Sequence, residues 1–123
     1  MKRTDFLVIG SGVAGLSFAI KVAERFPDRE VTVVTKSLGL ESNTRHAQGG
    51  IAVVMDSTSD SFEKHIHDTL TAGDGLCDPI AVRTIVSEGP DRLREVIAWG
   101  ARFNHHDGRI GLAREGGHSE NRI

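Results

Sequence analysis

Residues 5–15, DFLVIGSGVAG, join a short apolar run to a glycine-rich hexapeptide, and this junction decides the fold. The run DFLVI is typical of a β-strand that is buried on both faces. Residues 12–25 have the apolar spacing of an amphipathic helix, with a predicted buried face of Val13, Leu16, Ile20 and Ala23. Residues 30–35, EVTVVT, predict a second strand parallel to the first. We therefore expect an α/β protein with a Rossmann-type strand–helix–strand unit.

The hexapeptide has the pattern GxGxxG, formed by Gly10, Ser11, Gly12, Val13, Ala14 and Gly15. The pattern alone is a weak signal, but here it follows a predicted strand and opens a predicted helix, as a dinucleotide site requires. In such a site the first glycine makes a tight turn, the second lets the backbone approach a pyrophosphate, and the third allows close helix–sheet packing. The N–H groups at the start of the helix then hold the phosphate charge. A glycine-rich turn without a ligand is the alternative.

The end of the second strand bears on which nucleotide is bound. A site for NAD usually has an acidic residue there, about 20 positions after the glycines, to bind the ribose hydroxyls. This chain has Thr35, Lys36 and Ser37 instead. A lysine suits a phosphate or a differently held ribose, which weakens the case for a plain NAD site.

Helical patterns follow a loop predicted over residues 36–50. A helix over 60–72 would begin with a capping box of Asp60 and Glu63 and bury Phe62, Ile66 and Leu70. Asp78-Pro79 predicts the start of a helix that reaches Ser87, and Gly89-Pro90 is expected to separate it from another helix over 91–99. Residues 102–105 and 109–113 predict a short β-hairpin around His106-Asp107-Gly108. The doubly wound domain would be incomplete, because no further strand–helix unit follows.

Composition excludes several classes of protein. The 123 residues provide one domain, and the net charge of -2 gives no basic surface for nucleic acid. No apolar run approaches the roughly 20 residues of a membrane-spanning helix. The lone Cys77 allows no internal disulfide and favours a cytoplasmic location. We expect no metal site, because His65 and His67 lie on different faces of a predicted helix.

Five separated motifs carry a resemblance to a known family. They are VIGSGVAGLS, VTKS, NTRHAQGGIAVV, HIHDTLTAGDGLCD and LAREGGHS. In this order they resemble the N-terminal part of the L-aspartate oxidase family, within the flavoprotein superfamily of succinate dehydrogenase and fumarate reductase. The resemblance covers residues 5–123. It implies that residues 1–123 are the N-terminal part of a FAD-binding domain, with the rest of that domain, a capping domain and a helical domain absent.

The resemblance implies a non-covalently bound FAD. In covalent branches of the superfamily a histidine five residues before the Gln or Glu of the Gly-Gly turn holds the flavin, and here that position is Asn43. His46 is then a loop residue near the cofactor with a structural role. The cofactor-binding residues that the resemblance and the glycine pattern together predict are Gly10, Ser11, Gly12, Val13, Ala14, Gly15, Lys36, Asn43, Thr44, Arg45, His46, Ala47, Gln48, Gly49 and Gly50.

The resemblance also implies a reaction, the oxidation of L-aspartate to iminoaspartate with oxygen or fumarate as the final acceptor, in de novo NAD biosynthesis. Quinolinate synthase would use the product and is a candidate partner. Glu115 would orient the substrate by its ammonium group, whereas the catalytic arginine of the family would lie beyond residue 123, so these residues alone are expected to be inactive. Two alternatives remain open: a fragment of a fumarate reductase or succinate dehydrogenase flavoprotein subunit, and a non-catalytic dinucleotide-binding module.

Overall fold

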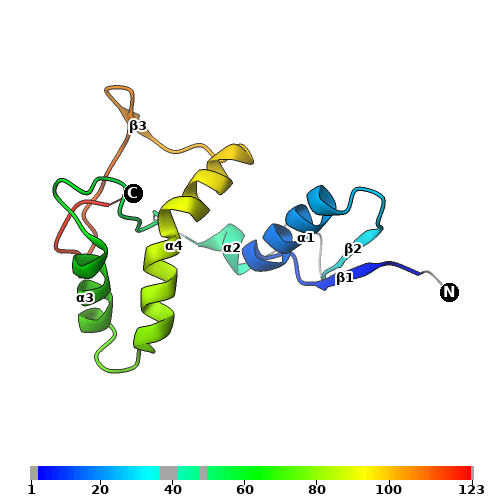
Figure 1. The fold of residues 1–123 in the computed structure, drawn as a ribbon, viewed down its shortest axis with the longest axis horizontal. Helices are drawn as coiled ribbons and strands as arrows, with labels where there is room; N and C mark the ends of the chain where they lie inside the picture. Colours follow the sequence, from blue (N-terminus) through cyan, green and yellow to red (C-terminus); the bar gives the residue numbers. More distant parts are fainter. Residues whose placement is uncertain (1–2, 37–41, 48–49, 123) are drawn as a thin grey trace. The chain divides into compact units, whose positions relative to one another are not determined.

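The computed structural model describes residues 3–36, 42–47 and 50–122, which divide into two compact units (Figure 1). The first unit is Met1–Gly49 and the second is Gly50–Ile123. The first contains β1 (Phe6–Ile9), α1 (Val13–Arg25), β2 (Val31–Val34) and α2 (Asn43–His46). The second contains α3 (Phe62–Ala72), α4 (Pro79–Ala98), β3 (His105–His106) and β4 (Arg109–Ile110).

The first unit contains the predicted strand–helix–strand arrangement. β1 and β2 pair in parallel, with Phe6 opposite Val31 and Ile9 opposite Val34. The Gly10 N–H extends the ladder by donating to the Val34 carbonyl at 2.8 Å. The chain therefore leaves β1 at the glycine turn while still bonded to β2, and α1 begins two residues later. The α/β prediction is confirmed.

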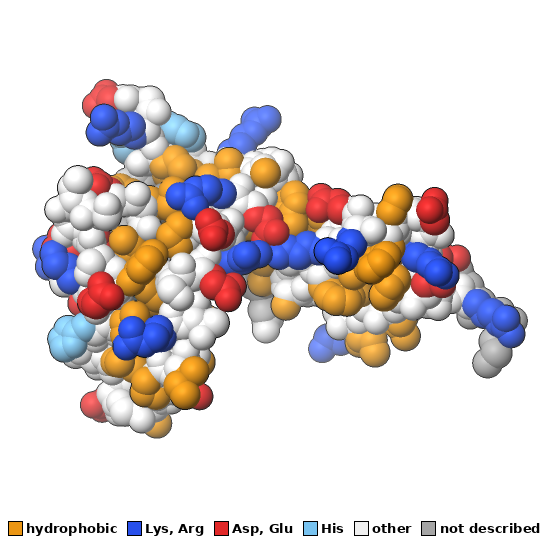
Figure 2. Space-filling model, viewed as in Figure 1, with side chains coloured by type: hydrophobic (Ala, Val, Ile, Leu, Met, Phe, Trp, Pro, Cys, Tyr) orange, Lys and Arg blue, Asp and Glu red, His pale blue; other side chains and the backbone are white. Residues whose placement is uncertain are grey.

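The predicted buried face of α1 is wrong. Ala19 and Val22 are the buried residues of α1, whereas Val13 and Leu16 are 59% and 42% exposed. The reason is close packing: Gly15 and Ala19 are small and face the sheet, so the larger apolar side chains lie elsewhere on the helix. Hydrophobic side chains accordingly reach the surface of this unit (Figure 2).

The prediction that the first strand is buried on both faces is also wrong. Side chains alternate between the two faces of a strand. Val8 is buried, and it faces α1, since its Cγ1 would lie 3.3 Å from a Cβ on Gly15. Leu7 and Ile9 point to the other face and are 56% and 83% exposed. In the described residues, α1 covers one face of this two-stranded sheet.

The second unit packs α3 against α4. Its core consists of Ile66, Val82 and Val86, with Phe62, Leu70 and Cys77 partly buried against it. The predicted stripe of Phe62, Ile66 and Leu70 is thus confirmed. The predicted cap of α4 is confirmed as well, because the Asp78 carboxylate accepts hydrogen bonds from the backbone N–H groups of Ile80 and Ala81.

The predicted helix break at Gly89-Pro90 is wrong, because α4 is one helix of 20 residues with Pro90 inside it. A proline ring normally clashes with the Cβ of the preceding residue, and Gly89 has none. Val53, which is buried, lies 3.4 Å from the point where that Cβ would be. The helix changes direction in its middle, as expected where a proline removes one backbone hydrogen bond (Figure 1).

Two further predictions of local structure need correction. α3 begins at Phe62 and is capped by Ser61, whose Oγ accepts from the Lys64 N–H at 3.2 Å, so Asp60 is not the cap. The predicted loop over 36–50 contains the short helix α2, capped by Ser42. The hairpin is confirmed but shorter than predicted, and Asp107 and Gly108 have the positive φ values that its tight turn requires.

Arg122 lies at the centre of a buried cluster of charged groups in the second unit. Its guanidinium donates to both carboxylate oxygens of Asp60 at 2.7 and 2.9 Å, and to Asp68 at 2.7 Å. The Arg122 side chain is 0% exposed. Asp60 faces inward for this reason, which explains why it does not cap α3. We call Arg122, Asp60 and Asp68 the buried ion cluster.

The buried ion cluster predicts how stability depends on pH. Burial raises the pKa of Asp68, but hydrogen bonds from the Ser119 N–H, the Arg122 guanidinium and the Ser119 hydroxyl outweigh it and lower that pKa to about 2. Because the folded-state pKa lies below the unfolded one, the ionised carboxylate stabilises the fold by roughly 2 kcal/mol above about pH 4. This contribution should disappear as the pH falls through about 2.

Urea denaturation between pH 7 and pH 2 measures this contribution. The Asp68→Asn variant should unfold at lower urea concentration at pH 7 and lose less stability on acidification than the unchanged protein, while Asp60, whose pKa is also lowered, still titrates in both. Equal acid sensitivity of the two proteins would contradict the assignment.

Candidate functional site

A pocket of about 560 Å³ lies in the first unit, where β1 and β2 end. Its lining consists of the last residue of each strand, the glycine turn, the two residues after β2, and the residues at the start of α2: Ile9, Gly10, Ser11, Gly12, Val34, Thr35, Lys36, Ser42, Asn43 and Thr44. The carboxyl ends of parallel strands are the usual place for ligands in α/β proteins. The pocket is therefore the candidate site.

The glycine turn is built by two close approaches of the backbone. Gly10 has a φ of +108°, which side-chain-bearing residues rarely adopt. A Cβ on Gly15 would lie 3.2 Å from the Gly10 carbonyl carbon and would contact its oxygen still more closely. Helix and turn can touch only because Gly15 has no side chain, so two of the glycine roles predicted from sequence match the geometry.

Gly12 differs from Gly15, because a side chain there would meet little protein. The nearest atom to a Cβ on Gly12 is Thr44 Oγ1 at 3.5 Å, an ordinary contact. The Gly12 backbone is extended, with φ −75° and ψ 178°, which alanine also adopts. The space in front of Gly12 belongs to the pocket, so a methyl group would occupy room that a ligand needs rather than disturb the fold.

The N-terminus of α1 has backbone N–H groups that are available to bind an anion. No acidic side chain lies in its first turn, and among the described residues nothing accepts from the N–H groups of Ala14 and Gly15. The Val13 N–H donates to Thr44 Oγ1 at 3.0 Å, which joins α2 to the start of α1. Free N–H groups at a helix start, together with the helix dipole, favour bound phosphate.

The charge of the pocket lining points the same way. Lys36 is the charged residue among the ten lining residues, and no carboxylate is among them. Ser11 Oγ donates to Thr35 Oγ1 at 3.2 Å, so a neutral hydroxyl pair stands at the end of β2. The site therefore offers one cation, several hydroxyl groups and backbone donors, a donor set that suits a nucleotide diphosphate.

The structure describes thirteen of the fifteen predicted binding residues. Six of them line the pocket: Gly10, Ser11, Gly12, Lys36, Asn43 and Thr44. Val13, Ala14 and Gly15 form the first turn of α1, and Arg45, His46 and Ala47 lie in α2 or at its end without lining the pocket. Gln48 and Gly49, like Ser37, lie outside the described residues, and Gly50 belongs to the second unit.

Sequence reasoning did not assign Ile9, Val34 and Thr35 to the site. Ile9 and Val34 are the last residues of their strands and are opposite each other in the register. Parallel pairing puts both strand ends at one edge of the sheet, so the predicted strand limits could have identified them. Thr35 follows the second predicted strand, but its hydrogen bond with Ser11 depends on the folded turn.

Glu115 lies in the second unit, at the start of a tight turn. Its carbonyl oxygen accepts from the His118 N–H at 3.1 Å, and Gly117 in this turn has a φ of +84°. The Glu115 side chain is exposed. An exposed carboxylate on this turn is available to bind a cation.

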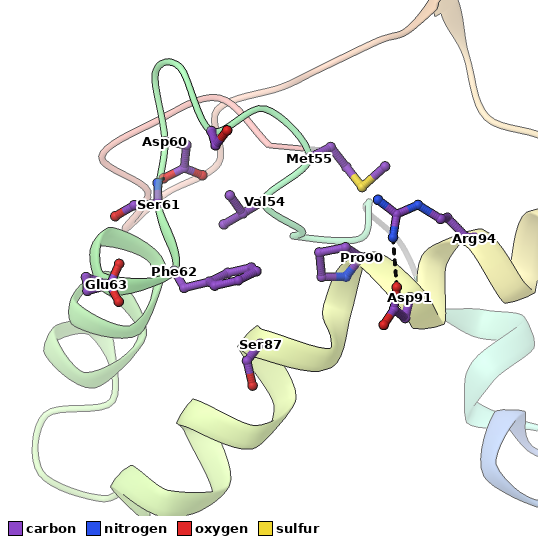
Figure 3. A pocket seen from close by; sticks show the side chains of 11 residues that line it. Val54, Met55, Asp60, Ser61, Phe62, Glu63, Ser87, Pro90, Asp91 and Arg94 are labelled. Carbon is purple, nitrogen blue, oxygen red and sulfur yellow. Dashed lines mark hydrogen bonds and ion pairs between the residues drawn. The ribbon is translucent and has the colours of Figure 1, made fainter.

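A second pocket, of about 490 Å³, lies between α4 and residues 54–63 (Figure 3). Three of its four charged side chains, those of Asp60, Asp91 and Arg94, already have partners, and the fourth is Glu63. Asp60 is bound by Arg122, and Arg94 forms an ion pair with Asp91 at 2.8 Å. Ser61 is occupied as the cap of α3. This pocket has neither a glycine turn nor a helix N-terminus with open N–H groups, because Ser61 caps α3, so it is the weaker candidate for a phosphate-bearing ligand.

The parallel strands, glycine turn and open helix N-terminus together define a nucleotide-binding protein of the Rossmann type. A search of protein families agrees: the FAD binding domain model matches residues 5–123. The chain belongs to that family. No helix among the described residues is long and apolar enough to cross a membrane, and those residues contain no group of three or more potential metal ligands.

The chain is similar to known L-aspartate oxidases. It is 53% identical over 123 residues to the chloroplastic L-aspartate oxidase of Oryza sativa subsp. japonica, covering 99% of this chain and 18% of the relative. It is 47% identical over 120 residues to L-aspartate oxidase of Streptomyces coelicolor, covering 97% of this chain and 20% of the relative. The chain thus spans about a fifth of the length of these relatives.

Solved structures of related flavoproteins have the same fold. E. coli quinol fumarate reductase matches with a TM-score of 0.86 and 34% identity, over 97% of this chain and 20% of that chain. The Mycobacterium smegmatis Sdh1 complex matches with a TM-score of 0.85 and 37% identity, over 98% of this chain and 20% of that chain. These matches support the expected superfamily.

The geometry of the glycine turn predicts different effects of two alanine substitutions. Gly15→Ala should lower the free energy of unfolding by about 1–3 kcal/mol, because the methyl group must displace the Gly10 backbone. Gly12→Ala should change it by less than about 0.5 kcal/mol, because the methyl group enters open space. Thermal unfolding of the ligand-free protein measures both. Equal destabilisation by the two substitutions would contradict this description of the turn.

Proposed function

We propose that the glycine pocket binds the diphosphate of FAD. The N–H groups of Ala14 and Gly15 would bind phosphate oxygens at the helix start, and Gly12 would allow the backbone to approach them. Lys36 would add a positive charge, and the side chains of Asn43 and Thr44 would add polar contacts at the other wall. The observation that carries this proposal is the open N-terminus of α1 beside Gly12, which lines the pocket and whose Cβ would meet little protein.

The predicted residues after Thr44 do not line the pocket, but they would extend the cofactor-binding segment along the chain. Arg45, His46 and Ala47 follow Thr44 directly, and Gln48, Gly49 and Gly50 come next in the chain. Glycines at positions 49 and 50 would let the main chain lie against a flat ring. Asn43 has an amide that cannot form a covalent bond to the flavin, so the cofactor would be held without one.

We infer that the whole protein is an FAD-dependent L-aspartate oxidase. Bound FAD would supply the redox chemistry, since it accepts a hydride from the substrate carbon. Iminoaspartate would be the product, oxygen or fumarate the final acceptor, and NAD biosynthesis the pathway, with quinolinate synthase as the enzyme that uses the product. Support comes from identities of 47–53% to relatives named L-aspartate oxidase. Because those from plants are named as chloroplastic, the cytoplasmic location is a prediction.

Glu115 is the residue of this chain that would distinguish aspartate from other dicarboxylates. Aspartate differs from succinate and fumarate by its ammonium group, and a carboxylate is the natural partner of an ammonium. Glu115 is exposed on a turn with a fixed backbone, so its carboxylate is free to make this contact. Its proposed role is to bind and orient the substrate, whereas the catalytic arginine would come from outside these residues.

A flavoprotein subunit of fumarate reductase or succinate dehydrogenase is the second candidate. The matches to solved structures of both enzymes favour it. The identity to those structures is 34–37%, below the 47–53% found for aspartate oxidases. Asn43 at the tether position and Glu115 at the proposed ammonium contact both favour the oxidase.

The proposal for the pocket predicts that Gly12→Ala weakens FAD binding. Its methyl group should keep the backbone away from the diphosphate and raise the dissociation constant at least about tenfold, which is about 1.4 kcal/mol. Flavin fluorescence during titration of the apoprotein measures the constant. Because Gly12→Ala should leave stability nearly unchanged, unaltered FAD affinity would show that the diphosphate binds elsewhere.

The proposal for Glu115 predicts that Glu115→Gln raises the KM for L-aspartate by about 10-fold to 100-fold, since a charge-assisted hydrogen bond of this kind contributes about 1.5–3 kcal/mol. The KM for fumarate, which has no ammonium group, should stay nearly constant. Steady-state assays of the full-length protein measure both. Glu120→Gln, on the same segment, is the control, and equal effects of the two substitutions on aspartate would refute the role of Glu115.

A further inference from the structure

We propose that Arg122 is a positioning residue for Glu115, and that the buried ion cluster thereby sets the preference for an amino acid over a plain dicarboxylate. The inference rests on the proposed function of Glu115. It concerns the segment from Ala113 to Arg122, which we call the Glu115 loop. Seven of its ten residues are exposed, and the buried one is Arg122 itself, so apolar packing does not explain how the loop holds its shape.

The backbone closes the Glu115 loop at its two ends. The Ala113 N–H donates to the Arg122 carbonyl at 2.8 Å, and the Arg122 N–H donates to the Ala113 carbonyl at 2.9 Å. This pair of bonds makes an isolated antiparallel bridge. Ala113 lies two residues before Glu115. The backbone just before Glu115 is therefore held by the main chain of Arg122.

The backbone after Glu115 is held by a turn and by Asp68. The His118 N–H closes the turn on the Glu115 carbonyl, and the Arg114 side chain donates to the His118 carbonyl at 3.0 Å. Ser119 follows, and both its N–H and its hydroxyl donate to Asp68 Oδ2, at 2.9 and 2.8 Å. The Glu115 turn is thus anchored to α3 through one carboxylate oxygen.

Arg122 connects these two anchors. Its main chain holds the Ala113 end of the loop, and its Nη1 donates at 2.7 Å to the same Asp68 oxygen that holds Ser119. Its Nε and Nη2 donate to the carboxylate of Asp60. Asp60 immediately precedes Ser61, the cap of α3. One side chain therefore binds a carboxylate just before α3 and another within it. Its loss would leave the Ser119 bonds to Asp68 without their charged partner and would weaken the support of the turn that carries Glu115.

Burial restricts the buried ion cluster to one geometry. The side chains of Arg122, Asp60 and Asp68 are 0%, 3% and 9% exposed. A buried carboxylate without its partner is costly, so the cluster has little freedom to rearrange. The ion pair between Lys64 and Glu120 also links α3 to the Glu115 loop, but its side chains are 49% and 29% exposed. Exposed pairs contribute little, which makes Glu120 a suitable control.

A lysine cannot replace Arg122 in this role. The guanidinium presents a planar fork that binds Asp60 through two nitrogens and Asp68 through a third, whereas an ammonium is a single point charge. Arg122→Lys keeps the positive charge beside the two carboxylates but cannot make all three hydrogen bonds to Asp60 and Asp68. Ser119→Ala is milder, because it removes one hydroxyl contact and keeps the backbone N–H bond to Asp68.

The test measures aspartate oxidation and fumarate reduction by the full-length FAD-loaded protein, with reduced methyl viologen as the electron donor for fumarate. Arg122→Lys should raise the KM for L-aspartate about tenfold and change the KM for fumarate by less than about twofold, because only aspartate uses Glu115. Ser119→Ala should raise the KM for aspartate by about two- to threefold. Glu120→Gln should leave both values unchanged.

A double substitution separates this inference from the proposal on which it rests. If Arg122 acts through Glu115, adding Arg122→Lys to Glu115→Gln should raise the KM for aspartate little further. Full additivity would overturn the inference, and so would equal losses with aspartate and fumarate. An unchanged KM in Ser119→Ala and Arg122→Lys, together with a raised KM in Glu115→Gln, would also overturn it while leaving the role of Glu115 intact. No effect of Glu115→Gln would reject the role of Glu115 itself.

Discussion

The contact between Gly10 and Gly15 is the constraint on which the first unit depends. Because Gly15 has no side chain, α1 can begin directly beside the turn that leaves β1, and its first N–H groups face the end of the sheet. A larger residue at this point would push the helix away from the turn. The position of the helix dipole, the open donors and the pocket itself all follow from this one contact.

In the second unit, ion pairs and hydrogen bonds rather than close backbone packing fix the geometry of the segment that ends at Arg122. Its apolar core is small, with Ile66, Val82 and Val86 at its centre, and the chain between the hairpin and Arg122 has little to bury. Charge and hydrogen bonding hold that part of the unit. A buried cluster of this kind gives less net stability than apolar packing would, because burial of charges is costly, but it specifies one geometry. Such specificity would suit the role proposed for Glu115, which requires its carboxylate to lie at a defined place.

Sequence patterns predicted the features that depend on neighbours in the chain. The strand–helix–strand unit, the cap at Asp78 and the hairpin turn at Asp107-Gly108 are of this kind. The errors depend on distant residues. Asp60 was assigned to a capping box because Arg122, 62 positions away, cannot be recognised as its partner locally. α4 continues through Pro90 where Val53 packs against Gly89, and apolar spacing alone could not show that α1 packs through its smallest residues.

The bond between the Val13 N–H and the Thr44 hydroxyl, 31 positions apart, has a thermodynamic consequence. It joins the start of α1 to α2, so residues of both segments line one pocket, and a molecule bound there would contact both. Such a molecule binds the folded chain and not the unfolded one. By mass action the melting temperature of this unit would then rise with the concentration of that molecule.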